Sequence, residues 1–260
     1  MIMKAAAIQL AVSDKKSKQE AVKHALDLID NCKGADLIVL PELWNIGFYN
    51  FDNYYALAET DSGETMSAVS DKAKELGCYI YSGTFVEKRK DKYYNSGILF
   101  DRTGTAVAKY SKIHLFSFES REKELLTAGD GITVADTEFG RIGIATCYEL
   151  RFPELFRKMT LEQGAEFFVI SAAWPAERLE AWTLYNKVRA TENFCWLISS
   201  NCTGNYGTVK GGGNSMIVSP SGAVTAYGGF EESIVTAEIS REEVMRTRSR
   251  FTALDDIRLI

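Results

Sequence analysis

Three side chains with complementary chemistry each follow an apolar run that is typical of a β-strand. Glu42 ends the segment DLIVLPE, Lys112 ends AVAKYSK and Cys147 ends RIGIATC. In α/β sheets, ligands bind at the carboxyl ends of strands, because side chains there project from a rigid frame into a crevice. We therefore expect a carboxylate, an ammonium and a thiol to meet in one site.

These three groups are sufficient for nucleophilic catalysis. A thiol becomes a good nucleophile only when it loses its proton, and a nearby ammonium lowers its pKa while a carboxylate accepts the proton. The ammonium also stabilises an oxyanion, together with backbone N–H groups such as that of Tyr148. The chain contains only two histidines, so the commonest general base is scarce. Glu42, Lys112 and Cys147 supply base, stabiliser and nucleophile without histidine.

Each of these residues also has a purely structural interpretation. Cys147 in IGIATC fits a small buried hydrophobe, Glu42 a salt bridge at a strand end, and Lys112 an exposed lysine. The catalytic interpretation therefore depends on the joint pattern and on the flanking residues.

Hydrophobic periodicity predicts a layered α/β fold that positions these residues, in a single domain over residues 1–260. Residues 111–130 have no clean period and predict a long loop, a feature that is often functional. The predicted helices cover residues 15–32, 66–76, 153–163 and 177–193. The predicted strands cover residues 5–10, 36–40, 78–86, 93–100, 105–110, 141–146, 167–172, 196–201, 215–218, 223–227 and 233–239.

Composition excludes several classes of partner and compartment. A net charge of −5 disfavours nucleic acid and membrane surfaces, because phosphates require clustered lysine and arginine. No apolar run approaches the roughly 18–20 residues of a membrane span. The five cysteines are irregularly spaced and lack a CxxC pair, which favours reduced thiols and a cytoplasmic location. No cluster of ligands suggests zinc, and the chemistry requires no cofactor.

The flanking segments resemble the nitrilase superfamily of carbon–nitrogen hydrolases. LPELW at residues 40–44, KYSKIHLF at 109–116 and CYELRFPE at 147–154 are similar to its three signature blocks, in the same order and at the usual separations. SAAWPAERLEAW at 171–182, RATEN at 189–193 and GGGNSMIVSPSG at 211–222 extend the resemblance over nearly the whole chain. The stretch after residue 241 adds no match.

The resemblance implies a four-layer α-β-β-α sandwich, usually paired as a homodimer. It also implies that Glu42 is the general base, Lys112 the stabiliser and Cys147 the nucleophile of an amidase that uses water and a small amide. Family members often carry a second glutamate near the lysine, and Glu122 in EKELLTAG is the best match. Glu119 and Glu124 are neighbours that could be mistaken for it, and a solvated surface charge remains an alternative.

CYELRFPE and AAWPAERLEAW look most like the ω-amidase group, whose substrates are 2-oxoglutaramate and similar carboxylate-bearing amides. Arg151 is then a candidate for a bidentate contact with the substrate carboxylate, with a structural salt bridge as the alternative. Phe48, Tyr148 and Trp174 are candidates for the pocket wall, although core packing would use them equally well.

Other functions remain open at this point. Within the superfamily they include amidases of deaminated glutathione, carbamoyl-amine hydrolases and aliphatic amidases. A non-catalytic binding protein on the same fold would lack the nucleophile, the base or the lysine, and this chain has all three. Leu179, Trp182 and Tyr185 recur at helical spacing and fit either a dimer contact or a core stripe.

Overall fold

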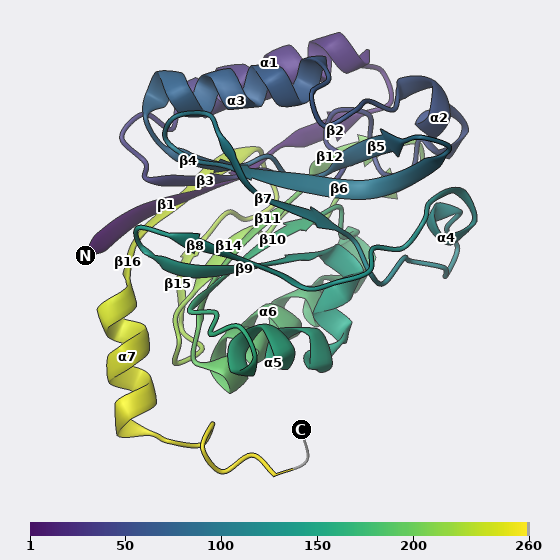
Figure 1. Ribbon diagram of the computed structural model, residues 1–260. Helices are drawn as coiled ribbons and strands as arrows, with labels where there is room; N and C mark the ends of the chain where they lie inside the picture. Colours follow the sequence, from purple (N-terminus) through teal and green to yellow (C-terminus); the bar gives the residue numbers. More distant parts are fainter. Residues whose placement is uncertain (259–260) are drawn as a thin grey trace.

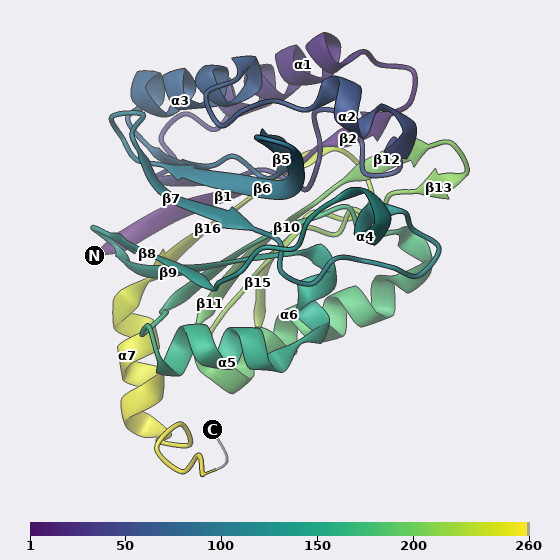
Figure 2. The same ribbon diagram turned by 45° about the vertical axis from the view of Figure 1, so that its right-hand side comes forward.

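The computed structural model describes residues 1–258 as two β-sheets packed face to face, with helices on both outer faces (Figures 1 and 2). Helices α1 (Lys18–Asp30) and α3 (Glu64–Leu76) cover one sheet. Helices α5 (Pro153–Leu161) and α6 (Leu179–Asn193) cover the other. The predicted α-β-β-α sandwich is confirmed. The last two residues of the single domain predicted over residues 1–260 lie outside the described residues.

The first sheet holds seven strands in the order β16-β1-β3-β4-β6-β5, with β7 paired to β6. The strands β1, β3 and β4 are parallel, β16 is antiparallel to β1, and β6 is antiparallel to β4. The bounds are β1 (Ile2–Gln9), β3 (Leu37–Val39), β4 (Tyr79–Tyr81), β5 (Phe85–Arg89), β6 (Lys92–Phe100), β7 (Ala106–Ser111) and β16 (Ser233–Ser240).

The second sheet holds six strands in the order β15-β14-β11-β10-β9-β8. Its central strands β9, β10 and β11 are parallel, as expected for a sheet whose crossovers pass through the helices α5 and α6. The bounds are β8 (Thr133–Thr137), β9 (Gly140–Thr146), β10 (Phe167–Ala172), β11 (Trp196–Asn201), β14 (Met216–Val218) and β15 (Val224–Tyr227).

A small third sheet connects the two large ones. Its strand β2 (Ala11–Ser13) continues from β1, and β12 (Thr203–Tyr206) continues from β11 and pairs with β2 in parallel. The strand β13 (Val209–Lys210) completes this sheet. Within the part of the chain that the structure describes, no helix has the length and apolar composition needed to cross a membrane.

The central strands are apolar on both faces because each sheet is covered on both sides. In β3, Val39 packs between the two sheets, whereas Ile38 packs under α1 and α3. In β10, Val169 packs between the sheets and Phe168 packs against the layer of α5 and α6. This confirms that the short apolar runs are strands buried on both sides.

The single strand predicted over residues 78–86 is wrong, because the structure divides it into β4 and β5. Between them, Gly83 has a φ of +66°, which glycine adopts at little cost. A Cβ at this position would lie 2.1 Å from the carbonyl oxygen of Pro41. Thr84 follows, and its Oγ1 accepts a hydrogen bond of 3.1 Å from the Leu43 N–H. The break therefore supports the turn that carries the predicted base.

Two elements carry no clear signal in the sequence. The strand β8 is short and half-polar, and helix α7 (Arg241–Arg250) buries only one side chain, Val244. The helix is held by a polar contact instead: Arg248 donates to the carbonyl oxygens of Ala165 at 2.7 Å and Asn193 at 3.1 Å. Figure 2 shows α7 leaving the sandwich along one side.

The apolar stripe on α6, formed by Leu179, Trp182 and Tyr185, faces the core and not the outer surface. Trp182 is fully buried, and Leu179 and Tyr185 pack against the same cluster beneath the second sheet. The opposite face of α6 exposes Leu184 and Val188 to solvent.

Three buried cysteines give the fold an expected pH dependence. Burial raises the pKa of Cys32 to about 12 and the pKa values of Cys78 and Cys195 to about 11. An unperturbed thiol titrates at about 8.5. As the pH rises above that value, the unfolded chain loses protons that the folded chain retains, so the free energy of unfolding falls.

We expect the free energy of unfolding to be at least about 4 kcal/mol lower at pH 10 than at pH 8, measured by urea denaturation. The variant Cys78→Ala should lose roughly 1–2 kcal/mol less over the same interval, because one of the three thiols is missing. An equal loss in both proteins would contradict this assignment.

Candidate active site

The structure brings the three predicted catalytic side chains to one end of the sandwich. Glu42 follows β3 and Lys112 follows β7, both in the first sheet, whereas Cys147 follows β9 in the second sheet. The backbone N–H of Glu42 donates to the carbonyl oxygen of Ala172 at 3.3 Å, at the end of β10. This bond joins the two sheets at the site.

Lys112 lies at the centre of a buried cluster of charges. Its Nζ donates to Glu42 Oε1 at 2.8 Å and to the two carboxylate oxygens of Glu122 at 2.9 and 3.1 Å. None of these three side chains is exposed to solvent. The ammonium also lies 5.4 Å from the centre of the Phe48 ring, within the range of a cation–π contact.

Asn95, which the sequence analysis did not single out, connects the two carboxylates. Its Nδ2 donates to Glu42 Oε1 at 2.8 Å and to Glu122 Oε1 at 2.7 Å. Its backbone carbonyl also accepts the Lys112 N–H at 2.8 Å. The other oxygen of Glu42, Oε2, accepts the Ala173 N–H at 3.1 Å. Asn95 therefore fixes the orientation of both glutamates relative to the lysine.

Glu122 is the glutamate of the long loop that reaches Lys112. It begins helix α4 (Glu122–Leu125), and its Oε2 accepts the Phe116 N–H at 2.7 Å. Glu119 and Glu124 point outward, with 77% and 63% of their side chains exposed. The geometry thus separates Glu122 from its two neighbours, as the spacing predicted.

Cys147 lies at a tight turn, where β9 passes into a 3₁₀ turn over Cys147–Arg151. Its φ of +50° is uncommon for a residue with a side chain and is often found at functional sites. The Glu42 carboxylate lies close enough to this thiol to raise its pKa. The nucleophile and the predicted base are therefore neighbours in the site.

Glu149, which was not among the predicted residues, connects the segment after Lys112 to the turn at Cys147. Its Oε2 accepts the Thr146 N–H at 2.8 Å, and its Oε1 accepts the Ile113 and His114 N–H groups at 2.9 and 3.1 Å. Tyr110 donates its hydroxyl to the same carboxylate at 2.6 Å. One buried carboxylate thus fixes the backbone on both sides of the site.

The environment keeps a proton on the thiol. Burial raises the pKa of Cys147, and the Glu42 carboxylate raises it further, whereas Lys112 lowers it by less. The ammonium therefore acts in the predicted direction, but it is outweighed. Burial alone would lower the pKa of Lys112, yet Glu122 and Glu42 raise it above its ordinary value. Burial also raises the pKa of Glu122, against the opposing effect of Lys112.

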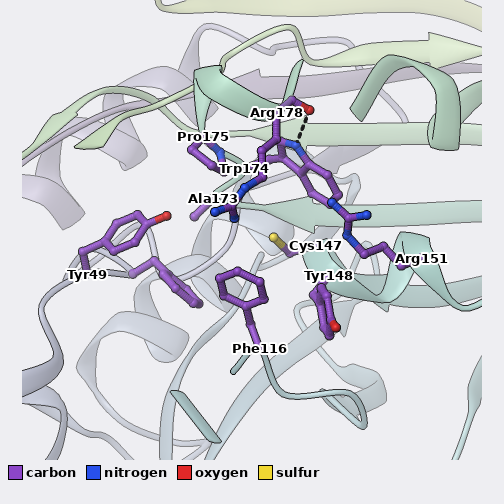
Figure 3. A pocket seen from close by; sticks show the side chains of 10 residues that line it. Tyr49, Phe116, Cys147, Tyr148, Arg151, Ala173, Trp174, Pro175 and Arg178 are labelled. Atoms are coloured by element: carbon purple, nitrogen blue, oxygen red, sulfur yellow. Dashed lines mark hydrogen bonds between the residues drawn. The ribbon is translucent and has the colours of Figure 1, made fainter. Parts of the chain in front are cut away.

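A pocket opens above the thiol, and all four predicted substrate-binding residues line it (Figure 3). Five of its ten lining residues are aromatic, the others are Cys147, Ala173, Pro175 and two arginines, and none is acidic. Tyr49, Phe116 and Arg178 also line the pocket and were not among the residues predicted to do so. The full lining is Phe48, Tyr49, Phe116, Cys147, Tyr148, Arg151, Ala173, Trp174, Pro175 and Arg178.

Arg151 has no structural salt bridge, so that alternative is wrong. No carboxylate among residues 1–258 lies within ion-pair distance of its guanidinium. The group instead lies 5.2 Å from the ring centres of Trp174 and of Tyr185, and Nη1 donates to the Tyr185 hydroxyl at 3.1 Å. Aromatic faces thus hold Arg151 in the pocket without neutralising its charge.

Comparison with known proteins finds matches over nearly the whole chain. Residues 4–249 match the sequence model of the carbon-nitrogen hydrolase family. The chain is 35% identical to the 2-oxoglutaramate amidase of Bacillus subtilis, over 96% of each chain. It is 33% identical to the 2-oxoglutaramate amidase of Paenarthrobacter nicotinovorans, over 97% of this chain and 88% of that protein. The crystal structure of Nit3 from Saccharomyces cerevisiae, a member of branch 10 of the nitrilase superfamily, superimposes with a TM-score of 0.87 at 28% identity, covering 96% of this chain and 94% of Nit3.

Proposed function

The chain belongs to the carbon-nitrogen hydrolase family and is a hydrolase that acts on amides, and on this premise we propose that it is an ω-amidase for 2-oxoglutaramate-like substrates. One arrangement carries the proposal: a protonated thiol, whose pKa the buried Glu42 carboxylate raises, lines a pocket whose charged side chains are two arginines. Such a site suits a small amide that also bears a carboxylate.

In the first half of the reaction Cys147 attacks the amide carbon. Because its thiol is neutral at rest, the proton passes to Glu42 as the carbon–sulfur bond forms. Lys112 and the Tyr148 N–H stabilise the oxyanion of the tetrahedral intermediate. Glu42 then gives the proton to the departing nitrogen, and the carbon–nitrogen bond breaks. Ammonia is released, and the acyl group remains on Cys147 as a thioester.

In the second half water hydrolyses the thioester. Glu42 removes a proton from water, the hydroxide adds to the carbonyl carbon, and the same oxyanion donors act again. The carbon–sulfur bond then breaks, the carboxylic acid is released, and Cys147 recovers its proton from Glu42. Glu122 supports both halves, because its contact with Nζ helps to keep Lys112 charged and in place.

The substrate assignment is supported by the charge of the pocket. The whole chain carries a net charge of −5, which gives an anionic substrate no long-range attraction. Recognition must therefore be local, and Arg151 provides a guanidinium that has no ion-pair partner within residues 1–258. We assign Arg151 to the carboxylate of the substrate. The names of the relatives from Bacillus subtilis and Paenarthrobacter nicotinovorans support the same class of substrate.

A matched pair of amides tests this assignment. Glutaramate and valeramide differ mainly in ending with a carboxylate or a methyl group. We expect kcat/KM for ammonia release to be about 100-fold higher for glutaramate, since one charge-assisted bidentate contact contributes about 1.5–3 kcal/mol. In the variant Arg151→Gln this preference should largely disappear. Equal turnover of both amides by the unmodified protein would overturn the substrate assignment.

Two broader features are also proposals. Exposed Leu184 and Val188 on the outer face of α6 support a homodimer, for which sedimentation velocity is the test. The five unpaired cysteines support a reducing compartment, the cytoplasm.

A further inference from the structure

A second arginine, Arg178, enters the catalytic pocket from a different element than Arg151. It ends the 3₁₀ turn Ala176–Arg178, just before α6, and its carbonyl oxygen accepts the Trp174 Nε1–H at 2.8 Å. That bond ties the backbone of Arg178 to the pocket wall. In the view of Figure 3 the two arginine side chains lie on either side of Cys147.

The guanidinium of Arg178 is held by aromatic rings. It lies 5.5 Å from the ring centre of Phe116 and 5.2 Å from that of Phe118. Within residues 1–258 its nearest carboxylate oxygen belongs to Glu119, at 3.8 Å, which is too long for a hydrogen bond. A guanidinium has five N–H donors, so Arg178 has unused donors on the pocket side.

The two arginines differ in how far their charges are compensated. Arg151 has no carboxylate neighbour in the described chain, whereas Arg178 has the distant and largely exposed Glu119. A substrate carboxylate is therefore expected to bind Arg151. A neutral acceptor, such as a carbonyl oxygen of the substrate, is sufficient at Arg178. A substrate that satisfies both arginines must carry two acceptors at the end remote from the amide.

We infer that Arg178 is a specificity-determining residue that donates hydrogen bonds to the 2-oxo oxygen of the substrate, while Arg151 binds the adjacent carboxylate. This inference rests on the proposed function, because it assumes that the acid end of an ω-amide occupies the pocket. The 2-oxo oxygen and the carboxylate lie on neighbouring carbons of the substrate. Two guanidinium groups that approach from different sides can therefore bind one of these groups each. The selected class is thus 2-oxo-ω-amides rather than ω-amides in general.

The test compares 2-oxoglutaramate with glutaramate, which lacks only the oxo group. We expect the unmodified protein to favour 2-oxoglutaramate in kcat/KM by about 10- to 100-fold, the usual effect of one charge-assisted hydrogen bond. In Arg178→Met, which keeps an apolar side chain over Phe116 and Phe118, this ratio should fall to near one through a higher KM. Turnover of glutaramate and valeramide should fall by a smaller factor than turnover of 2-oxoglutaramate.

Two further variants and two contrary outcomes make the test decisive. Arg178→Lys should recover part of the ratio, since it restores one donor. Arg141→Met, a change at an exposed arginine remote from the pocket, should leave the ratio unchanged. If Arg178→Met lowers turnover of all three amides equally, the residue only supports the loop of Phe116 and the inference is overturned. If the unmodified protein turns over glutaramate and valeramide equally, the proposed function fails instead.

Discussion

Replacing Cys147 with alanine is expected to abolish ammonia release from every accepted amide, with a loss of at least about 10⁴-fold in kcat. The reason is that Cys147 is the one thiol among the residues described as lining the pocket. Alanine keeps the Cβ of cysteine, so the backbone at φ +50° meets no new steric conflict. The variant should therefore fold normally, which circular dichroism and thermal unfolding can check.

A matched control is available in Cys195. This thiol is buried beneath the second sheet, where it contacts the Ala165 carbonyl oxygen at 3.3 Å, and it lies outside the pocket wall. Cys195→Ala should cost about 1–2 kcal/mol of stability and leave turnover unchanged. Intact-mass measurement of quenched reactions should detect an acyl adduct on the unmodified protein and none on Cys147→Ala. Undiminished turnover by Cys147→Ala would refute the mechanism.

The sequence was sufficient for those parts of the site that depend on strand ends. Strand periodicity locates where a strand stops, and a side chain just beyond that point in an α/β sheet projects toward the ligand. This logic placed Glu42, Lys112 and Cys147 together. In the structure Lys112 forms an ion pair with Glu42, and the Glu42 carboxylate raises the pKa of Cys147. The four covering helices and most strands followed from the same periodicity, whereas the arrangement in two stacked sheets was implied by the family resemblance.

The supporting residues could not be predicted in this way. Asn95 lies within β6, where a polar residue usually indicates only an exposed strand face, and it reaches both glutamates only because β7 and the long loop fold beside it. Glu149 lies in the turn after the nucleophile, and its partners Ile113 and His114 are more than 30 residues away in the chain. Neither role has a local signal, because both arise from contacts between distant segments.

The pocket wall was only partly accessible from the sequence. Arg151 stood out because it follows the nucleophile within the same short motif. Arg178 lies in a segment with ordinary helix-start composition, and its position depends on the 3₁₀ turn that aims it back over Phe116. The direction in which the pKa of the Cys147 thiol shifts could not be predicted from the sequence either. The opposing effects of burial, Glu42 and Lys112 on the thiol pKa depend on depth and distance, which the sequence does not contain.

The variant Glu42→Gln removes the carboxylate that raises the thiol pKa together with burial. Glutamine has nearly the same shape, and Lys112 keeps its ion pair with Glu122, so the fold should survive. The thiol, however, loses the carboxylate that takes its proton, and kcat near neutral pH should fall by about 10³-fold. Glutamine removes the negative charge that raises the pKa of Cys147, while Lys112 continues to lower it. The thiol pKa should therefore fall relative to the unmodified protein.

The pH dependence distinguishes loss of a base from a general disturbance of the site. In Glu42→Gln the reactive species is the thiolate, so log kcat should rise with a slope of about one per pH unit until the thiol pKa is reached. The unmodified protein reacts from the neutral thiol and should show no such rise. Glu122→Gln makes the same chemical change at the other carboxylate but retains the base, so its profile should keep the shape of the unmodified protein. A flat profile for Glu42→Gln would contradict the role of Glu42 as the base. Removal of its carboxylate would then have left the pH dependence of kcat the same as in the unmodified protein.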